Sequence, residues 1–323
     1  MFRKNPEILV LILVLVGVLI LMLALNGPGF FKLGNIQSMA FQLPELGILS
    51  LAMMITMLTS GINLSIIAST NLSGIVMALI LTQLAPADGG SALGVVLLAL
   101  LAGLAISAII GLVNGWLIAY LDISPILATL GTMILVSGLA IVFTKGYVIS
   151  GFPKEMLFIG NGMILGIPLP LLIFLACAAI LGVVLTRTPL GMQVYLFGSN
   201  PTATFYSGVN NKTVLMWVYL ISGLLTSVAA MIMISRFNSA KADYGESYLL
   251  LTILASVLGG VSAAGGFGRV SGLVVALVIL QVISSGLNLF GVSAFLTVAL
   301  WGVVLIFVMV VKYLLDQRAQ KRA

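Results

Sequence analysis

The sequence predicts an all-α membrane protein with about ten transmembrane helices. Of its 323 residues, 61% are hydrophobic and 7% are charged, whereas a soluble domain has about 25% charged residues. Apolar runs near the ~20 residues that a spanning helix needs follow one another along the chain. A chain with so few polar residues cannot cover a water-facing globule, so its outer surface must meet lipid.

The apolar runs are separated by short segments of Gly, Pro, Asn and charged residues, which typically end helices. The runs cover residues 8–25, 44–60, 64–84, 93–120, 126–144, 167–186, 213–235, 248–258, 270–289 and 292–313. No polar stretch is long enough to form a soluble domain. Residues 1–323 are therefore predicted to form a single transmembrane domain.

Two of these runs are unusual because they are short or interrupted. Residues 248–258 would form only about 16 Å of helix, which cannot cross a hydrocarbon core of about 30 Å. Residues 44–60 stop at Gly61-Ile62-Asn63, where Gly and Asn break the apolar pattern. Interrupted helices in the two halves of a chain point to the substrate path of a transporter. The alternative is ordinary glycine-mediated helix packing.

Hydroxyl and amide side chains gather around the first interruption. If the helix continues through Gly61, residues 56, 59, 63 and 70 share one helical face. Neutral hydroxyls and amides can exchange hydrogen bonds with an uncharged polyol. The candidates for lining a substrate path are Thr56, Thr59, Asn63, Ser65, Thr70 and Ser256. The alternative is that they link helices by hydrogen bonds worth about 0.6 kcal/mol each.

Several function classes are excluded by composition. The chain has no His and a single Cys, Cys177, so the usual ligands for zinc or haem and the pair for Cys–His catalysis are missing. The net charge of +6 comes from Lys and Arg at the ends of apolar runs, and no basic, aromatic-rich patch predicts nucleic-acid binding. The glycine-rich residues 259–269 lack the G-K-[ST] ending of a P-loop.

Charged residues within the spans are scarce. Glu45 is the only serious candidate for an ion or proton route, and one carboxylate near the end of a run is weak support for a proton-coupled carrier. We therefore expect no catalytic residues and no metal or cofactor bound by this chain. The energy for uphill transport would then come from a separate ATPase.

The largest polar segment on the predicted inner side spans residues 187–211. Within it, Ser199 or Asn200 can cap a helix, and Pro201 fits the first helical position. A short helix over residues 201–207, ending at Gly208, would suit a groove on a cytoplasmic partner. The alternative is a plain surface loop.

Several stretches occur in the order and spacing of one family. They are TSGINLS at 59–65, VNG at 113–115, PILATLGT at 125–132, GSNP at 198–201 leading to SGVN at 207–210, ASVLGG at 255–260 with GGFGR at 265–269, and GLNLFGVS at 286–293. Over nearly its whole length, the chain thus resembles the permease subunits of ATP-binding-cassette (ABC) sugar importers of the ribose, xylose, arabinose and galactoside group.

This resemblance implies ten helices in two groups of opposite orientation, like the vitamin B12-type permeases, in the bacterial inner membrane. It also implies a second permease chain, a cytoplasmic ABC ATPase that binds ATP and Mg, and a periplasmic sugar-binding protein. In the family, the segment that matches residues 198–209 contacts the ATPase. The residues that this assigns to coupling are Gly198, Asn200, Pro201, Ala203, Ser207 and Gly208.

The chain departs from the family pattern at a few positions. The family often has Asp where Asn63 stands, Glu-Ala-Ala-like residues at 202–204, and Lys where Phe267 stands. These differences leave the class unchanged but put the sugar in doubt. Residues 237–243 also resemble autoinducer-2-type permeases, in which two different permease chains pair.

The predicted function is therefore the permease subunit of an ATP-driven, binding-protein-dependent importer of a small neutral sugar or sugar-like molecule. Within the same class, the alternative is a branched-chain amino acid importer permease. A secondary carrier would need buried acids, His or sodium-site residues, which are scarce here. A passive polyol channel would need no ATPase.

The charges of the loops predict that both termini are cytoplasmic. With ten spans, nine Lys and Arg fall inside and five outside, which is the direction of the positive-inside rule. The inner set is Arg3, Lys4, Arg187, Lys212, Arg269, Lys312, Arg318, Lys321 and Arg322. Reporter fusions at Ala323 and Asp88 should report opposite sides of the membrane, and the same side for both would contradict this topology.

Overall fold

The computed structural model describes residues 6–84, 91–293, 296–304, 306 and 310, and these residues are mostly helical. The α-helices are α1 (Pro6–Asn26), α2 (Leu33–Met57), α3 (Ile66–Leu84), α4 (Leu93–Tyr120), α5 (Pro125–Thr144), α6 (Lys154–Asn161), α7 (Leu169–Arg187), α8 (Pro189–Ser199), α9 (Pro201–Tyr206), α10 (Asn211–Phe237), α11 (Tyr248–Leu258) and α12 (Val270–Leu289). Eight described helices are long and apolar enough to span a membrane. The predicted all-α polytopic membrane fold is confirmed.

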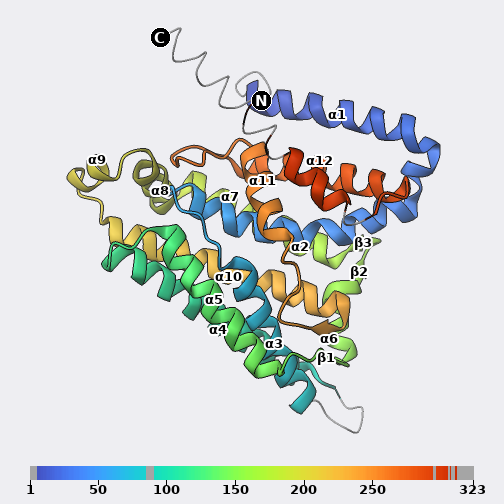
Figure 1. The fold of residues 1–323 in the computed structure, drawn as a ribbon, viewed down its shortest axis with the longest axis horizontal. Coiled ribbons are helices and arrows are strands. Elements are labelled where there is room, and N and C mark those ends of the chain that lie inside the picture. The colour runs from blue at the N-terminus through green and yellow to red at the C-terminus, as the bar shows by residue number, and fades with distance from the viewer. Residues whose placement is uncertain (1–5, 85–90, 294–295, 305, 307–309, 311–323) are drawn as a thin grey trace.

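Short irregular elements join the helices. The 3-10 helix η2 (Gly27–Phe31) connects α1 to α2. Strand β1 (Ile149–Ser150) pairs antiparallel with β4 (Ser239–Ala240). Strand β2 (Met163–Ile164) pairs in the same way with β3 (Ile167–Pro168). These pairings lie with α6 at one end of the bundle, and α8 and α9 lie at the other end (Figure 1).

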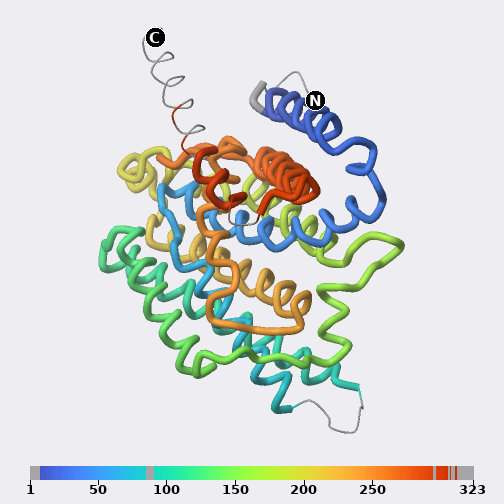
Figure 2. Tube along the Cα trace, turned by 45° about the vertical axis from the view of Figure 1, so that its right-hand side comes forward, coloured from blue at the N-terminus to red at the C-terminus, as the bar shows by residue number. Residues whose placement is uncertain are grey.

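Helix α2 is the centre of one half of the bundle. It is buried over most of its length and packs against α7, α10, α11 and α12. Helix α1 lies at the edge, where it packs against α12 (Figures 1 and 2). Because α1 is strongly apolar and yet largely exposed, its outer face is suited to lipid.

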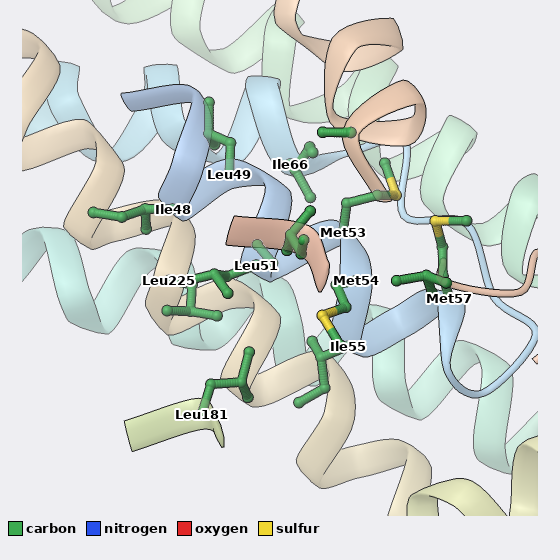
Figure 3. Packing of buried hydrophobic residues seen from close by; sticks show 14 of the residues in the cluster. Ile48, Leu49, Leu51, Met53, Met54, Ile55, Met57, Ile66, Leu181 and Leu225 are labelled. Carbon is green, nitrogen blue, oxygen red and sulfur yellow. The ribbon is translucent and has the colours of Figure 1, made fainter. Parts of the chain in front are cut away.

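The largest hydrophobic core surrounds α2. In Figure 3, Ile48, Leu51 and Ile55 of α2 lie near Leu181 of α7 and Leu225 of α10. All five side chains are buried. This packing holds α2 between α7 and α10. It thereby positions the C-terminal end of α2, from which the irregular residues 58–65 continue.

The first predicted interruption is real, but its position needs a correction. Helix α2 begins at Leu33, before the predicted 44–60 run, and ends at Met57, and residues 58–65 are irregular. The condition for a shared face, a helix that continues through Gly61, is not met, because the amides of Thr59 and Gly61 both close turns onto the carbonyl of Thr56. Thr56, Asn63 and Thr70 therefore do not share one helical face.

The remaining runs agree with the structure in most respects. The short run 248–258 is confirmed as α11, and the first part of the polar segment 187–211 forms α8. Of the last run, 292–313, residues 296–304 are helical. Asp88 and the Lys and Arg residues at 3, 4, 312, 318, 321 and 322 lie outside the described residues. The grouping into two inverted halves stays a prediction.

Small residues allow α4 and α10 to cross closely. Ser107, Gly111 and Gly115 follow each other at four-residue spacing on α4, so they lie on one face. A Cβ atom at Gly111 would overlap the carbonyl oxygen of Tyr219, and one at Gly223 would overlap that of Ser107. Such small-residue contacts are how membrane helices bring their backbones together.

We therefore expect Gly111→Ala to lower stability by about 1–3 kcal/mol, because the added methyl group has no space at the crossing. Gly131→Ala is the matched control, since a Cβ at Gly131 of α5 meets nothing within 4 Å. Thermal unfolding in detergent should show a lower Tm for the first variant only. Equal Tm values for both variants would contradict the close crossing.

Candidate functional site

The two interrupted regions of the chain meet at the end of the bundle that holds α8. Residues 58–65 follow α2, and residues 259–269 follow α11. The Ser60 hydroxyl donates a hydrogen bond of 2.6 Å to the carbonyl of Ala264. The amide of Gly266 donates one of 2.9 Å to the carbonyl of Leu58. Two irregular segments about 200 residues apart thus satisfy part of each other's backbone hydrogen bonding, as irregular backbone in a membrane protein requires.

Helices α8 and α9 form a defined structure next to this contact. Thr188 caps α8 by accepting a hydrogen bond from the amide of Gly191 at 3.3 Å. Asn200 caps α9 by accepting one from the amide of Ala203 at 2.9 Å, with Pro201 at the first helical position. The predicted short helix at 201–207 is therefore present as Pro201–Tyr206. Its docking role stays a prediction.

The α8–α9 segment is attached directly to both interrupted regions. A Cβ at Gly198 would overlap the carbonyl oxygen of Leu58 and the amide of Gly266, so only glycine fits there. The Tyr195 hydroxyl donates a hydrogen bond of 2.8 Å to the carbonyl of Gly268. Burial raises the pKa of Tyr195, which keeps this donor protonated. A displacement of α8 would therefore act on both segments.

The outer side of α9 is exposed and aromatic. Phe205 and Tyr206 are 63% and 83% exposed, and their rings stack edge to face. A cavity of about 900 Å³ lies between α9 and the turn after α4, and Asp122 and Lys212 are among its lining residues. This end of the bundle thus presents aromatic side chains beside a hollow, which suits contact with another protein.

Several of the predicted path residues form a buried hydrogen-bond network. Asn63 donates to Ser222 at 3.1 Å and accepts from the Ser65 hydroxyl at 2.8 Å. Asn114 donates to the same Ser65 oxygen at 2.8 Å. The network joins the interruption after α2 to α4 and α10. In this structure, it therefore links helices, as the packing alternative proposed.

The other predicted path residues bond to nearby backbone. Thr56 donates to the carbonyl of Met53, Thr59 to that of Thr56, Thr70 to that of Ile66 and Ser256 to that of Thr252. All four are buried. Their contact with a solute stays a prediction, since these bonds already satisfy their hydroxyl donors.

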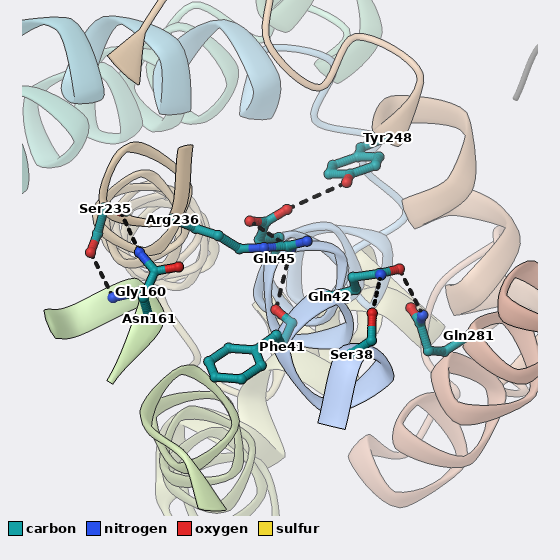
Figure 4. Close-up of polar contacts among 10 residues, drawn as sticks. All are labelled: Ser38, Phe41, Gln42, Glu45, Gly160, Asn161, Ser235, Arg236, Tyr248 and Gln281. Carbon is teal, nitrogen blue, oxygen red and sulfur yellow. Dashed lines mark hydrogen bonds and ion pairs between the residues drawn. The ribbon is translucent and has the colours of Figure 1, made fainter. Parts of the chain in front are cut away.

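A buried ion pair lies between α2 and α10, which the sequence alone did not reveal. The Arg236 guanidinium is 3.0 Å from a carboxylate oxygen of Glu45, whose side chain is fully buried. The same guanidinium donates to the carbonyl of Phe41, and the Tyr248 hydroxyl donates to Glu45 at 3.4 Å (Figure 4). In the sequence, Glu45 lies near the end of one apolar run, and Arg236 comes directly after another. The only sequence signal was one acid and one base flanking two spans on the same side.

At the end of the bundle opposite α8 and α9, hydrogen bonds hold α6 and the neighbouring loops in place. The Gly160 amide and the Asn161 side chain of α6 both donate to Ser235 of α10, at 2.6 and 2.9 Å (Figure 4). Asn238 accepts from the amide of Phe152 at 2.9 Å. These bonds hold α6 against the end of α10. Within the part of the chain that the structure describes, no cluster of three His, Cys, Asp or Glu could hold a metal ion.

Comparison with known proteins places the chain in a family. Residues 35–310 match the family described as branched-chain amino acid transport system / permease component. The chain is 35% identical over 304 residues to the ribose import permease protein RbsC of Bacillus subtilis (strain 168), which covers 93% of this chain and 90% of that protein. No solved structure matches the chain.

A second relative is the autoinducer 2 import system permease protein LsrD of Escherichia coli (strain K12). It is 33% identical over 271 residues, which covers 82% of this chain and 79% of that protein. The LsrD protein of Shigella flexneri matches to the same extent. The fold and these matches define a multi-pass membrane permease. The chain belongs to the branched-chain amino acid transport system / permease component family, and the predicted resemblance is confirmed.

The buried ion pair should matter more for stability than an exposed one. We expect Arg236→Met to lower stability by about 3–5 kcal/mol, because it leaves the Glu45 charge buried without its partner. The control is Lys241→Met, which removes the exposed Lys241–Asp243 pair at 2.7 Å and should cost about 1 kcal/mol or less.

The double variant Glu45→Met with Arg236→Met tests whether the two charges act as a pair. It should recover much of the loss in Tm, because no uncompensated charge remains. Additive losses in thermal unfolding of the detergent-purified protein would contradict the pairing.

Proposed function

We propose that this chain is the permease subunit of an ATP-driven, binding-protein-dependent importer of a small neutral sugar or sugar-like molecule. The observation that carries the proposal is the attachment of the exposed α8–α9 segment to both interrupted regions, through Gly198 and Tyr195. A partner that moves α8 would thereby act on the irregular backbone that follows α2 and α11. The names of the relatives, a ribose and an autoinducer 2 import permease, support the substrate class.

A neutral substrate agrees with the polar groups inside the bundle. Hydroxyl and amide groups, which donate to and accept from sugar hydroxyls, predominate among its buried polar side chains. The intramembrane charges of Glu45 and Arg236 neutralise each other. A zwitterionic amino acid would be expected to require separate charged or helix-end groups, so the branched-chain amino acid alternative is less well supported.

The proposal assigns partners on both sides of the bacterial inner membrane. A cytoplasmic ABC ATPase, which holds ATP and Mg, contacts α9 through Ala203 and its neighbours. A second permease chain, identical or different, completes the transmembrane part, and a periplasmic binding protein selects the sugar. Both termini lie in the cytoplasm under this arrangement.

The test is uptake by vesicles that contain this chain, its partner permease and the ATPase. Uptake of D-ribose, D-xylose, L-arabinose or D-galactose should require both ATP inside and the binding protein outside. Concentrative uptake that needs neither component would indicate a secondary carrier. Equilibration without accumulation would indicate a channel.

A charge on α9 should uncouple transport from ATP hydrolysis. Ala203 is exposed, so Ala203→Glu should leave insertion and Tm unchanged while sugar uptake falls by about tenfold or more, because a carboxylate at a desolvated protein contact is costly. Ala203→Ser, which is small and neutral, is the matched control and should retain uptake.

Disulfide crosslinking tests the contact itself. In a Cys177→Ser background, a cysteine at Ala203 should crosslink to engineered cysteines on the ATPase. A cysteine at Leu165, which is 98% exposed at the opposite end, should not. If the Ala203 cysteine never crosslinks while the complex hydrolyses ATP, α9 is not the docking helix.

A further inference from the structure

A cavity of about 240 Å³ lies beside the buried ion pair, among α2, the end of α10, α11, α12 and the helical residues 296–304. Its polar lining includes Gln42, Arg236 and Gln281, and its aromatic lining includes Phe237, Tyr248 and Trp301. A second cavity of about 430 Å³ shares Phe237 and Tyr248 with it. The two hollows therefore adjoin along the connection from α10 to α11.

The side-chain amides of Gln42 and Gln281 are held by hydrogen bonds but keep free hydrogen-bonding capacity. Gln281 donates to the side-chain oxygen of Gln42 at 3.2 Å, and Gln42 donates to Ser38 at 2.9 Å (Figure 4). A carboxamide has two donor hydrogens and an oxygen with two lone pairs. These bonds use only part of that capacity, so both amides can bond a further polar molecule.

The position of Arg236 indicates that this cavity contains water or a polar solute and not lipid. Arg236 lies in the last turn of α10, and an arginine near the end of a membrane helix keeps its guanidinium in contact with water. The Arg236 side chain remains 22% exposed while Glu45 beside it is fully buried. The exposed part of the guanidinium is therefore expected to contact water in the cavity that Arg236 lines.

The combination of groups suits one ligand class. A sugar ring has apolar C–H faces that pack on flat aromatic rings, and hydroxyls at its edge that exchange hydrogen bonds with planar amides. Trp301 lines the cavity with a side chain that is otherwise packed in the core, so a ring edge or face is held rigidly at this surface. Because Glu45 compensates Arg236, the cavity carries no net charge that would select an anion. Its volume lies below the ~300–1,000 Å³ of sites for drug-sized ligands, which suits a single ring.

We propose that this cavity is a monosaccharide subsite on the transport path, with Trp301 and Tyr248 packing on the ring and Gln42, Gln281 and Arg236 bonding its hydroxyls. The assignment rests on the proposed function and moves the sugar contacts away from the network around Asn63. Binding is weak, with Kd near ~1 mM, because a site on a path must release what it passes.

The test uses thiol labelling of the full chain in membrane vesicles, in a Cys177→Ser background. Ser284 lines the cavity, and Ser284→Cys should react with a charged, water-soluble methanethiosulfonate. Leu21→Cys is the matched control. It lies on the exposed face of α1, next to Met22, whose sulfur approaches Gly286 of α12, so it has a similar depth but should face lipid.

We expect Ser284→Cys to react at least about tenfold faster than Leu21→Cys, since the reaction needs water and a thiolate. At least one of D-ribose, D-xylose, L-arabinose and D-galactose, at about 100 mM, should slow the reaction, and D-ribose 5-phosphate should not. Equal, slow labelling at both positions would overturn the wet cavity. Fast labelling that none of the four sugars slows, or that the phosphate slows equally, would overturn the sugar subsite.

An aromatic series tests the role of Trp301. In the Ser284→Cys background, Trp301→Leu should raise the protecting sugar concentration about 2- to 10-fold, and Trp301→Phe should raise it less. Equal values for both variants would remove Trp301 from the site. Tyr248→Leu and Tyr248→Phe give the same comparison if the Trp301 variants do not insert.

Sugar protection of the thiol and ATP-dependent uptake can fail independently of each other. Sugar protection without ATP-dependent uptake would leave the subsite standing and reject the importer. ATP- and binding-protein-dependent uptake of a sugar that gives no protection would leave the importer standing and reject the subsite.

Discussion

The structure depends on the rule that backbone polar groups within a bilayer must be satisfied by the protein itself. Eight described helices meet this rule with their own hydrogen bonds. The two interruptions, at residues 58–65 and 259–269, satisfy many of their backbone amides by local turns. They also bond to each other, through Ser60 to Ala264 and Gly266 to Leu58. The glycine at 198 follows from this contact, because a Cβ there would overlap the carbonyl oxygen of Leu58 and the amide of Gly266.

This constraint also explains which features the sequence could predict. Apolar runs of about 20 residues, a run of 11 residues at 248–258, and the Asn-Pro start at 200–201 each depend on local composition, and the structure contains all three. The course of the chain around Gly61 depends on Tyr219, whose hydroxyl occupies the space where a side chain would lie. That contact joins residues far apart in the chain, so periodicity alone could not place the break.

Contacts between residues far apart in the chain also determine the candidate site, so the sequence could not predict them. Thr56 and Thr70 are polar residues within apolar runs, and Asn63 lies at the break between two runs, which favoured a substrate path. A polar residue in a span can equally bond to a neighbouring helix. In the structure, Asn63 and Thr70 bond Ser222 and the carbonyl of Thr226 on α10. Thr56 bonds the carbonyl of Met53 in its own helix. Arg236 and Glu45 are 191 positions apart, and only the fold brings them to 3.0 Å. Long-range charge pairs carry little signal in one sequence.

Helix α11 extends from the contact beside α8 to the proposed sugar cavity. Its first residue, Tyr248, bonds Glu45 and lines the proposed sugar cavity. Its last residue, Leu258, leads into the segment that bonds Leu58 and packs against Gly198 of α8. An 11-residue helix is about 16 Å of rigid rod. A movement of α8 that displaces residues 259–269 must therefore either shift Tyr248 relative to Glu45 or break a turn of α11, and either change alters the cavity at the other end of the rod.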